Sequence, residues 1–202
     1  MDLLIVLLSF LLGGVPFGLL LGRLKGIDVR VSGSGHIGAT NVMRNTGVGL
    51  GLVTFFLDAA KGAAGPLMVR YLDLPPSMMA WTGLAAVLGH CFSPFLRLRG
   101  GKGVATLVGA FSIMDLPAAL LAAMVFATAL VLSRYVALAS LFLALALAGA
   151  TWSQFGFSDP RTVVAWAAAC LVAGRHRQNW RRMAEGREGK LVSGGPEGPF
   201  RG

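Results

Sequence analysis

The first segment that could do chemistry is a polar, glycine-rich loop at residues 33–44, which reads GSGHIGATNVMR. Glycines let backbone N–H groups approach an anion closely, and a helix that begins after such a loop adds positive potential at its N-terminus. The loop contains the pattern G-x-G-x-x-G, but a dinucleotide site also needs a preceding strand and a βαβ unit, which the surrounding apolar pattern does not provide. We interpret it as a candidate anion-binding loop, although a plain flexible connection explains it equally well when it is considered alone.

A second candidate is the sequence Gly-Gly-Lys-Gly at residues 100–103. It is not a Walker phosphate-binding loop, because Lys102 is followed by glycine and not by serine or threonine. Three glycines can still expose backbone donors to a phosphate, and Lys102 supplies a positive charge beside them. A basic turn on the cytoplasmic side of a membrane explains Arg97 and Arg99, but it leaves the three glycines around one lysine unexplained.

The third candidate is a basic segment at residues 174–190, in which His176 and Asn179 are three residues apart. On a helix this spacing puts both side chains on one face, where they can orient a polyol at the mouth of a membrane cavity. The arginines of the segment also fit a simpler role in binding anionic lipid headgroups, and a single interfacial histidine is as often structural as functional. Asp58 and Lys61 share a helix face within an apolar run, and we interpret them as a structural ion pair near the cytoplasmic end of that run.

Composition identifies the elements that must hold these segments. Of the 202 residues, 55% are hydrophobic and 13% are charged, whereas an average soluble domain carries roughly 25% charged residues. This shortage of charge points to lipid as the solvent for much of the surface. The net charge of +9 comes from basic residues between apolar runs, which indicates membrane topology and anionic partners rather than nucleic acid. Cys91 and Cys170 lack the spacing of a disulfide or a metal site.

Apolar runs that cross a membrane need roughly 17–25 residues. Three are clear, at residues 3–22, 48–69 and 78–95, and the first lacks the features of a cleaved signal peptide. Residues 104–174 are nearly all apolar, but they are divided into four pieces by interruptions at residues 115–117, 133–134 and 153–160. We expect an all-α integral membrane protein, a bundle of about seven transmembrane helices of which some are short. Five spans, with two long crossings in place of four, would leave the chain ends on the same sides.

Basic residues set the expected orientation, because Lys and Arg concentrate in cytoplasmic loops. With the N-terminus outside and the C-terminus cytoplasmic, nearly all of the 18 Lys and Arg residues fall on the cytoplasmic side; Arg70 and Arg161 lie outside and Lys61 lies within a span. All three candidate segments then face the cytoplasm. We expect one transmembrane catalytic domain at residues 1–192 and a disordered Gly/Pro-rich tail at residues 193–202.

Together, the three segments resemble the acyl-phosphate-dependent glycerol-3-phosphate acyltransferases of bacteria, the PlsY family. The family's patterns GSGN-x-GATN-x-x-R, GGKGVAT and RHR-x-N-x-x-R match in order, spacing and expected side of the membrane. Asp-x-x-Lys-Gly at residues 58–62 and Ser-Arg-Tyr at residues 133–135 match as well, so the resemblance covers nearly the whole chain, from Gly13 to Lys190. The chain departs from the pattern at His36, where the family usually has Asn, and at Gln178, where it usually has Glu.

The resemblance implies transfer of a fatty acyl group from acyl phosphate to the sn-1 hydroxyl of glycerol 3-phosphate. The products would be inorganic phosphate and lysophosphatidic acid, in an early step of phospholipid biosynthesis at the bacterial inner membrane. It implies a set of residues that bind substrate phosphate: Gly33, Ser34, Gly35, Thr40, Asn41, Arg44, Gly100, Gly101, Lys102 and Gly103. Glycerol phosphate would be bound by Arg44, Lys102, His176 and Asn179, and catalysis would depend on these four residues together with Ser34.

The implied partners are the two substrates, membrane lipids and an enzyme that supplies acyl phosphate. We expect no cofactor, and no metal either, because no cluster of carboxylates accompanies the loops. The base that takes the hydroxyl proton is left open between His176 and the oxygens of the acyl phosphate itself. Positioning and charge stabilisation can supply most of the acceleration, since an acyl phosphate is already activated.

The histidines bear on the acyl donor. Another class of acyltransferases handles thioester donors with the pair H-x-x-x-x-D, but the residues five positions after His36, His90 and His176 are Asn41, Phe95 and Arg181. We therefore expect acyl phosphate to be the donor, and acyl-CoA or acyl-carrier protein not to serve directly.

The competing hypothesis is a small membrane transporter of phosphorylated solutes. Such a protein places polar residues at the middle of the membrane, where both sides can reach them. The candidate ligands here cluster on one side, which favours the enzyme.

Overall fold

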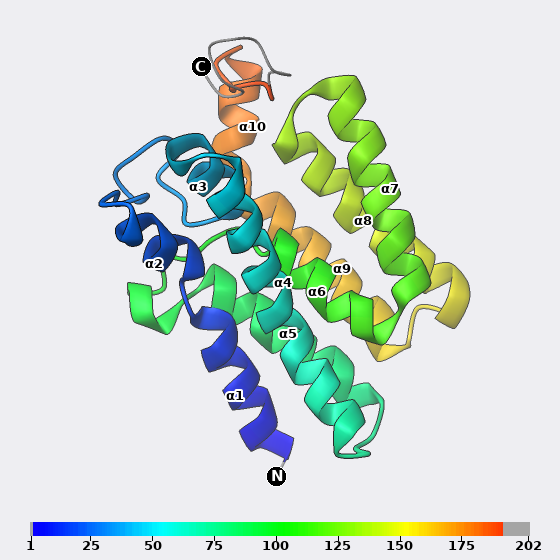
Figure 1. Ribbon diagram of the computed structural model, residues 1–202. Helices are drawn as coiled ribbons and strands as arrows, with labels where there is room; N and C mark the ends of the chain where they lie inside the picture. Colours follow the sequence, from blue (N-terminus) through cyan, green and yellow to red (C-terminus); the bar gives the residue numbers. More distant parts are fainter. Residues whose placement is uncertain (1, 192–202) are drawn as a thin grey trace. The chain divides into compact units, whose positions relative to one another are not determined.

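The computed structural model describes residues 2–191, and within that range it contains helices and no strand (Figure 1). The first six helices are α1 (Asp2–Gly14), α2 (Phe17–Leu24), α3 (Ala39–Thr46), α4 (Val48–Tyr71), α5 (Ser77–Cys91) and α6 (Val104–Met114), with a short 3₁₀ turn η1 (Pro94–Leu96) after α5. The others are α7 (Leu116–Ser133), α8 (Val136–Phe155), α9 (Pro160–Arg175) and α10 (Arg177–Ala184).

The chain divides between Met114 and Asp115 into two compact units, one with α1–α6 and one with α7–α10. A single catalytic domain at residues 1–192 stays a prediction, and the expected tail at residues 193–202 lies outside the described residues.

Five segments are long and apolar enough to cross a membrane, so the expected multi-span membrane protein is confirmed. They are Asp2–Leu24, Val48–Tyr71, Ser77–Leu96, Leu116–Ser133 and Val136–Phe155. The first and the last of the four pieces in residues 104–174 are α6, with 11 residues, and α9, with 16 residues. At 1.5 Å per residue these helices span about 16 and 24 Å, less than the hydrocarbon core of about 30 Å. The seven-span count and the orientation therefore stay predictions.

The first apolar run is not one continuous helix, because α1 ends at Gly14 and α2 begins at Phe17. Pro16 explains the break, since proline has no N–H and its ring clashes with the carbonyl one turn earlier. The break leaves the Val15 carbonyl outside any regular helix ladder. It accepts from the Phe17 N–H at 3.1 Å and from Lys61 Nζ of α4 at 2.7 Å.

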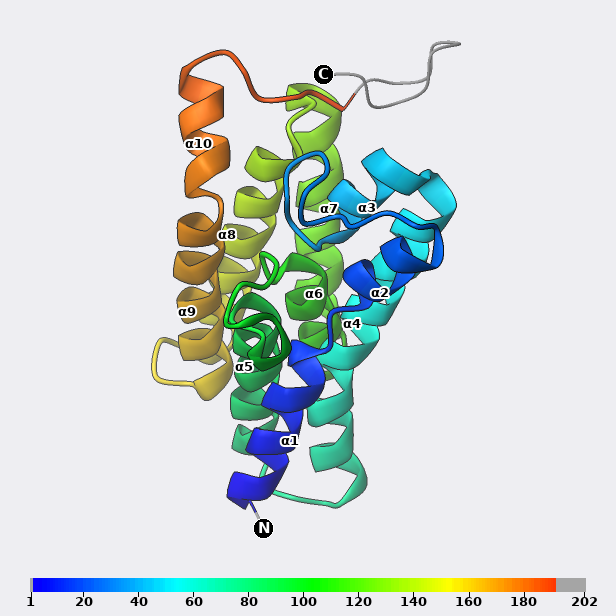
Figure 2. The same cartoon turned by 90° about the vertical axis from the view of Figure 1, so that its left-hand side faces the viewer.

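Glycines set the closest helix contacts within residues 2–114. A Cβ on Gly13 of α1 would lie 2.2 Å from the Ala86 carbonyl oxygen of α5, and one on Gly89 of α5 would lie 2.0 Å from the Phe10 carbonyl oxygen of α1. The same reciprocal arrangement joins α4 and α6 through Gly62 and Gly109. Small residues allow membrane helices to approach until their backbones touch, and Figure 2 shows α1 running beside α5.

Residues 115–191 form a second helical unit in which α7 packs against α8 and α8 against α9. The helices begin and end where the sequence predicted interruptions. Asp115 caps α7 by accepting from the Ala118 N–H at 3.1 Å, and Asp159 precedes α9 and accepts from the Arg161 N–H at 2.8 Å. Arg134 ends α7 in the left-handed conformation, with a φ of 61°.

The α4–α6 contact predicts a stability difference between two glycines. Gly109→Ala should lower the melting temperature in detergent by roughly 2–10 °C, because its Cβ would lie 1.8 Å from the backbone oxygen of Ala59 and overpacking costs about 1–3 kcal/mol. Gly149→Ala in α8 is the control, since nothing lies within 4 Å of its added Cβ. Equal melting temperatures for the two variants would show that the α4–α6 contact tolerates separation.

Candidate active site

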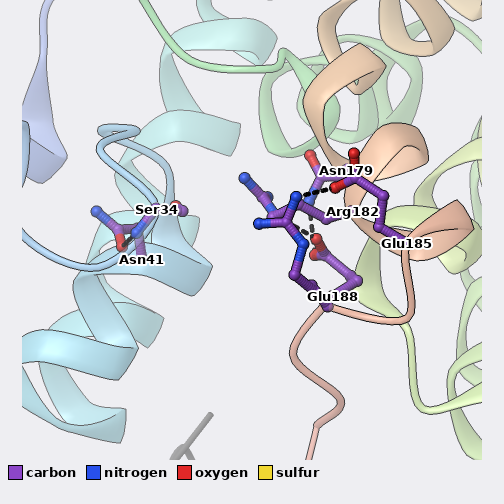
Figure 3. A network of polar contacts seen from close by, with 7 residues as sticks. Ser34, Asn41, Asn179, Arg182, Glu185 and Glu188 are labelled. Atoms are coloured by element: carbon purple, nitrogen blue, oxygen red, sulfur yellow. Dashed lines mark hydrogen bonds and ion pairs between the residues drawn. The ribbon is translucent and has the colours of Figure 1, made fainter.

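The first glycine-rich loop is organised by one buried side chain, that of Asn41 in the first turn of α3. Its Nδ2 donates to three carbonyl oxygens of the loop, those of Val29 at 2.8 Å, Ser32 at 3.1 Å and His36 at 2.8 Å. Its Oδ1 accepts from the Ser34 N–H at 2.8 Å, as Figure 3 shows, and from Asn45 Nδ2 at 3.2 Å. The Asn41 amide therefore holds the loop, and the structure gives no support for its predicted contact with substrate phosphate.

Ser34 is presented between two glycines that need the left-handed conformation. Gly33 has a φ of 59° and Gly35 a φ of 72°, and a Cβ on Gly33 would lie 2.4 Å from Asn41 Oδ1. The glycines thus let the loop close over Asn41, and the half-buried Ser34 lies in the turn between them. Thr40 and Arg44, both half-buried, lie on the helix α3 that follows.

An ion pair stiffens the beginning of this loop. The Arg30 backbone N–H and its guanidinium Nε both donate to Asp28 Oδ1, at 3.0 and 2.9 Å. These hydrogen bonds from Arg30 hold the pKa of the Asp28 carboxyl well below its ordinary value. The carboxylate consequently stays ionised, and keeps its partner, throughout the neutral range of pH.

The Gly-Gly-Lys-Gly loop packs closely against the end of α5. A Cβ on Gly100 would lie 2.0 Å from the His90 carbonyl oxygen, and one on Gly101 would lie 2.1 Å from His90 Nε2. The Gly100 N–H donates to the Cys91 carbonyl at 3.2 Å, and the Gly101 N–H donates to the His90 carbonyl at 2.9 Å. These two N–H groups are therefore engaged within the protein, and the glycines serve close packing rather than the presentation of donors that the sequence suggested.

Lys102 follows these glycines and is half-buried. Gly103, with a φ of 85°, turns the chain into α6, so Lys102 lies two residues before the positive N-terminal end of that helix. The segment that precedes this loop contacts α1, because Ser93 Oγ donates to the Gly14 carbonyl at 2.6 Å. The Ser93 carbonyl also accepts from the Leu98 N–H at 2.8 Å within the same segment.

The predicted ion pair between Asp58 and Lys61 is present and buried, with Oδ1 and Nζ 2.8 Å apart and side chains 3% and 1% exposed. Sequence reasoning missed a third member, His90, whose Nδ1 lies 3.6 Å from the same Asp58 oxygen. The available signal was general: a charged group within a membrane span needs partners, and His90 is a polar residue within the third apolar run.

His176 lies at the junction of α9 and α10 rather than inside one helix, and it is 2% exposed. Its backbone carbonyl accepts from the Asn179 N–H at 2.8 Å, so the chain continues in a helical turn across the junction. The ring Nδ1 lies 2.8 Å from the Val172 carbonyl oxygen. Because a carbonyl can only accept, we assign the proton to Nδ1, which makes Nε2 the basic nitrogen of the neutral ring.

Asn179 belongs to a polar network that sequence reasoning did not identify. Glu188 Oε1 accepts from Asn179 Nδ2 at 2.7 Å, and Oε2 accepts from Arg182 Nε at 2.7 Å, as Figure 3 shows. The Glu188 side chain is only 6% exposed. Gly186, with a φ of 67°, turns the chain back onto α10 and brings Glu188 to this position. The available signal was an acidic residue two positions after a glycine in a basic segment.

The segment after Glu188 contacts the turn between α7 and α8. The Leu191 N–H donates to the Arg134 carbonyl at 2.7 Å, and Lys190 Nζ lies 5.6 Å from the centre of the Tyr135 ring. The Ser-Arg-Tyr sequence at residues 133–135 therefore contacts the end of the third candidate segment through Arg134 and Tyr135. Within residues 2–191, no three His, Cys, Asp or Glu side chains gather as metal ligands.

The structure thus places the predicted residues in both units. Ser34, Thr40, Asn41, Arg44 and Lys102 belong to the unit with α1–α6, and His176 and Asn179 belong to the unit with α7–α10. Within the first unit Asn41 and Ser34 are in direct contact, and within the second His176 and Asn179 share one turn of backbone.

Comparison with known proteins identifies the family. The family model for glycerol-3-phosphate acyltransferase matches residues 3–186. The chain is 41% identical over 189 residues to the glycerol-3-phosphate acyltransferase of Geotalea daltonii, covering 93% of this chain and 96% of that protein. It is 45% identical over 186 residues to the enzyme of the same name from Myxococcus xanthus, covering 89% and 94%.

Solved structures agree with this match. The crystal structure of PlsY (YgiH), an integral membrane glycerol 3-phosphate acyltransferase, in its glycerol 3-phosphate form is 36% identical, with a TM-score of 0.88 and 94% of each chain covered. The lysophosphatidic acid form gives a TM-score of 0.86 at 35% identity, covering 94% of this chain and 95% of that one. The match gives no support to the transporter hypothesis. The chain belongs to the glycerol-3-phosphate acyltransferase family, PlsY.

Proposed function

We propose that this glycerol-3-phosphate acyltransferase takes its acyl group from acyl phosphate and transfers it to the sn-1 hydroxyl of glycerol 3-phosphate. The products are lysophosphatidic acid and inorganic phosphate, and the reaction is an early step of phospholipid biosynthesis. The observation that carries the proposal is the placement of Lys102, held by packed glycines just before the N-terminus of α6. The relatives with solved structures were crystallised in glycerol 3-phosphate and lysophosphatidic acid forms, which supports the same acceptor and product here.

The chemistry needs no covalent intermediate with the enzyme. The acceptor hydroxyl attacks the carbonyl carbon of the acyl phosphate, the C–O bond to phosphate breaks, and phosphate leaves with the bonding electrons. Arg44 and Lys102 neutralise phosphate oxygens of acyl phosphate and of glycerol 3-phosphate, Ser34 donates a hydrogen bond to a phosphate oxygen, and His176 and Asn179 orient the glycerol moiety. The hydroxyl proton passes either to the basic Nε2 of His176 or to an oxygen of the departing phosphate.

The network around Glu188 supports the proposed role of Asn179. A carboxylate that accepts from Nδ2 fixes which way the amide of Asn179 is turned, and the Arg182 guanidinium fixes the carboxylate in turn. A group whose orientation is set before the substrate arrives loses less freedom on binding. Membrane lipids and an enzyme that supplies acyl phosphate remain the proposed partners.

Lys102→Ala should lower kcat/KM by about ten- to a hundredfold or more, because hydrogen bonds to charged groups contribute roughly 1.5–3 kcal/mol each. The fold should persist, since Lys102 is only half-buried and lies between glycines. Phosphate release from palmitoyl phosphate in the presence of glycerol 3-phosphate measures the rate. Arg99→Ala, which removes an exposed basic residue of the same loop, is the matched control and should keep near-normal turnover. Near-normal turnover of Lys102→Ala would remove this lysine from the site.

Donor choice follows from the leaving group. A departing phosphate needs cations and hydrogen-bond donors around its oxygens, whereas a thioester gains from a His/Asp dyad, and none of the three histidines of the chain precedes an Asp by five residues. Purified enzyme should form lysophosphatidic acid from acyl phosphate with chelator present, and should not do so from acyl-CoA or acyl-carrier protein. Robust turnover on acyl-CoA alone would contradict the proposed site, and loss of turnover with chelator would contradict metal-free chemistry.

We also propose seven spans with the N-terminus outside and the site facing the cytoplasm, supported by the distribution of basic residues. In a Cys170→Ala background, which removes the exposed native cysteine, a membrane-impermeant thiol reagent should label Ser133→Cys only from the cytoplasmic side. The exposed Ser158→Cys should be labelled only from outside. Labelling of Ser133→Cys from outside, or from neither side, would count against the additional pair of spans.

A further inference from the structure

Three buried polar side chains of the unit with α1–α6, Asp58, Lys61 and His90, form a cluster that we call the buried triad. They are 2%, 3% and 4% exposed. Asp58 Oδ1 lies 2.8 Å from Lys61 Nζ and 3.6 Å from His90 Nδ1. An ion pair inside an apolar bundle is costly to desolvate and is weak evidence for stability on its own. None of the three is among the proposed substrate-binding residues.

The triad touches the Lys102 loop directly through His90. While Nδ1 lies 3.6 Å from Asp58 Oδ1, Nε2 lies against the backbone of Gly101, so closely that an added Cβ would be 2.1 Å away. The His90 carbonyl, in addition, accepts from the Gly101 N–H at 2.9 Å. The ring and the carbonyl of one residue therefore define where Gly101 lies, and Gly101 directly precedes Lys102.

The α4 turn that carries the triad also defines the far end of the loop. Gly62, next to Lys61, packs so closely that its Cβ would lie 2.0 Å from the Thr106 carbonyl oxygen of α6. Ala59, next to Asp58, contacts Gly109 of α6 in the same way. The loop at residues 100–103 is thus held at its start by His90 and at its end by α6, and both supports rest on one turn of α4.

We propose that Asp58 and His90 are positioning residues of the acyl transfer reaction. They fix the Gly100–Gly103 backbone and, through it, aim Lys102 at the phosphate of glycerol 3-phosphate. Asp58 orients the His90 ring, and the ring supports Gly101. This inference rests on the proposed function, because it assumes that Lys102 binds that phosphate. A displacement of about 1 Å in such a group is enough to cost about a hundredfold in rate.

Two substitutions of His90 separate its two contacts. In His90→Asn the amide nitrogen takes the place of Nδ1 beside Asp58, but no ring lies against Gly101, which keeps only its hydrogen bond to the backbone carbonyl of residue 90. In His90→Gln the longer side chain reaches Gly101, but it loses the ring that links this support to Asp58. Both should raise KM for glycerol 3-phosphate by roughly tenfold. KM for palmitoyl phosphate should rise less, and the melting temperature should stay close to that of the unsubstituted protein.

A double-substitution cycle with Lys102→Ala distinguishes positioning from a general structural role. If His90 acts through Lys102, adding His90→Asn to Lys102→Ala should change KM for glycerol 3-phosphate by less than about twofold. A merely structural role would give the same added effect in both backgrounds. Thr82→Val is the control, since Thr82 is buried in the same helix and bonds only the Met78 and Met79 carbonyls in that helix; it should leave KM for glycerol 3-phosphate unchanged.

The outcomes separate this inference from the proposed function. If Lys102→Ala leaves KM for glycerol 3-phosphate unchanged, the proposed phosphate site is wrong, and the positioning role fails with it. If Lys102→Ala raises that KM and a folded His90 variant does not, the proposed site stands and the positioning role of His90 is overturned. Should His90→Asn fail to fold, His90→Gln, which is closer in size to histidine, carries the same test.

Discussion

The ammonium group of Lys61 has almost no contact with solvent, and it is held by the Asp58 carboxylate at 2.8 Å and the Val15 carbonyl at 2.7 Å. A charge in this position has to be neutralised locally, because neither water nor lipid can do so. The Val15 carbonyl is available because Pro16 ends the helix ladder of α1. One buried cation thereby joins the break in the first apolar run to the middle of α4. Through Asp58 it also reaches His90 at the end of α5, so that three separate membrane segments meet at a single charge.

The two glycine-rich loops share a way of being built. Each closes on a buried polar side chain, Asn41 in the first loop and His90 in the second, and each uses glycines where the backbone comes too near for a Cβ. In both loops, a polar or charged side chain that could contact a phosphate, Ser34 or Lys102, lies directly between two glycines. The glycines are explained by the approach of the backbone to its support. In each loop some backbone groups are engaged within the protein, among them the Ser34 N–H of the first and the Gly100 and Gly101 N–H groups of the second.

In the third segment, residues 174–190, a buried carboxylate fixes the position of a candidate side chain. Gly186 reverses the chain after α10, and Glu188 then accepts from both Asn179 and Arg182. The following residues contact the α7–α8 turn, so the orientation of the Asn179 amide depends on a segment that has left the helix. Acidic residues are scarce in this basic region, and the buried carboxylate of Glu188 has two hydrogen-bond donors, Asn179 Nδ2 and Arg182 Nε. In this segment a buried carboxylate thus holds the Asn179 amide and the Arg182 guanidinium in place.

Hydropathy, charge and glycine spacing in the sequence determined that the chain is a multi-span helical membrane protein, where most helices end, that Asp58 pairs with Lys61, and which family it resembles. These properties are local, since each depends on residues within one helix or one loop. Tertiary structure decided that Asn41 serves the loop, that the Gly100 and Gly101 N–H groups are engaged, that His90 lies beside Asp58, and that Glu188 accepts from Asn179. A hydrogen bond between Lys61 and Val15 joins residues 46 positions apart, and only packing can choose such a partner among the many carbonyls that the sequence offers.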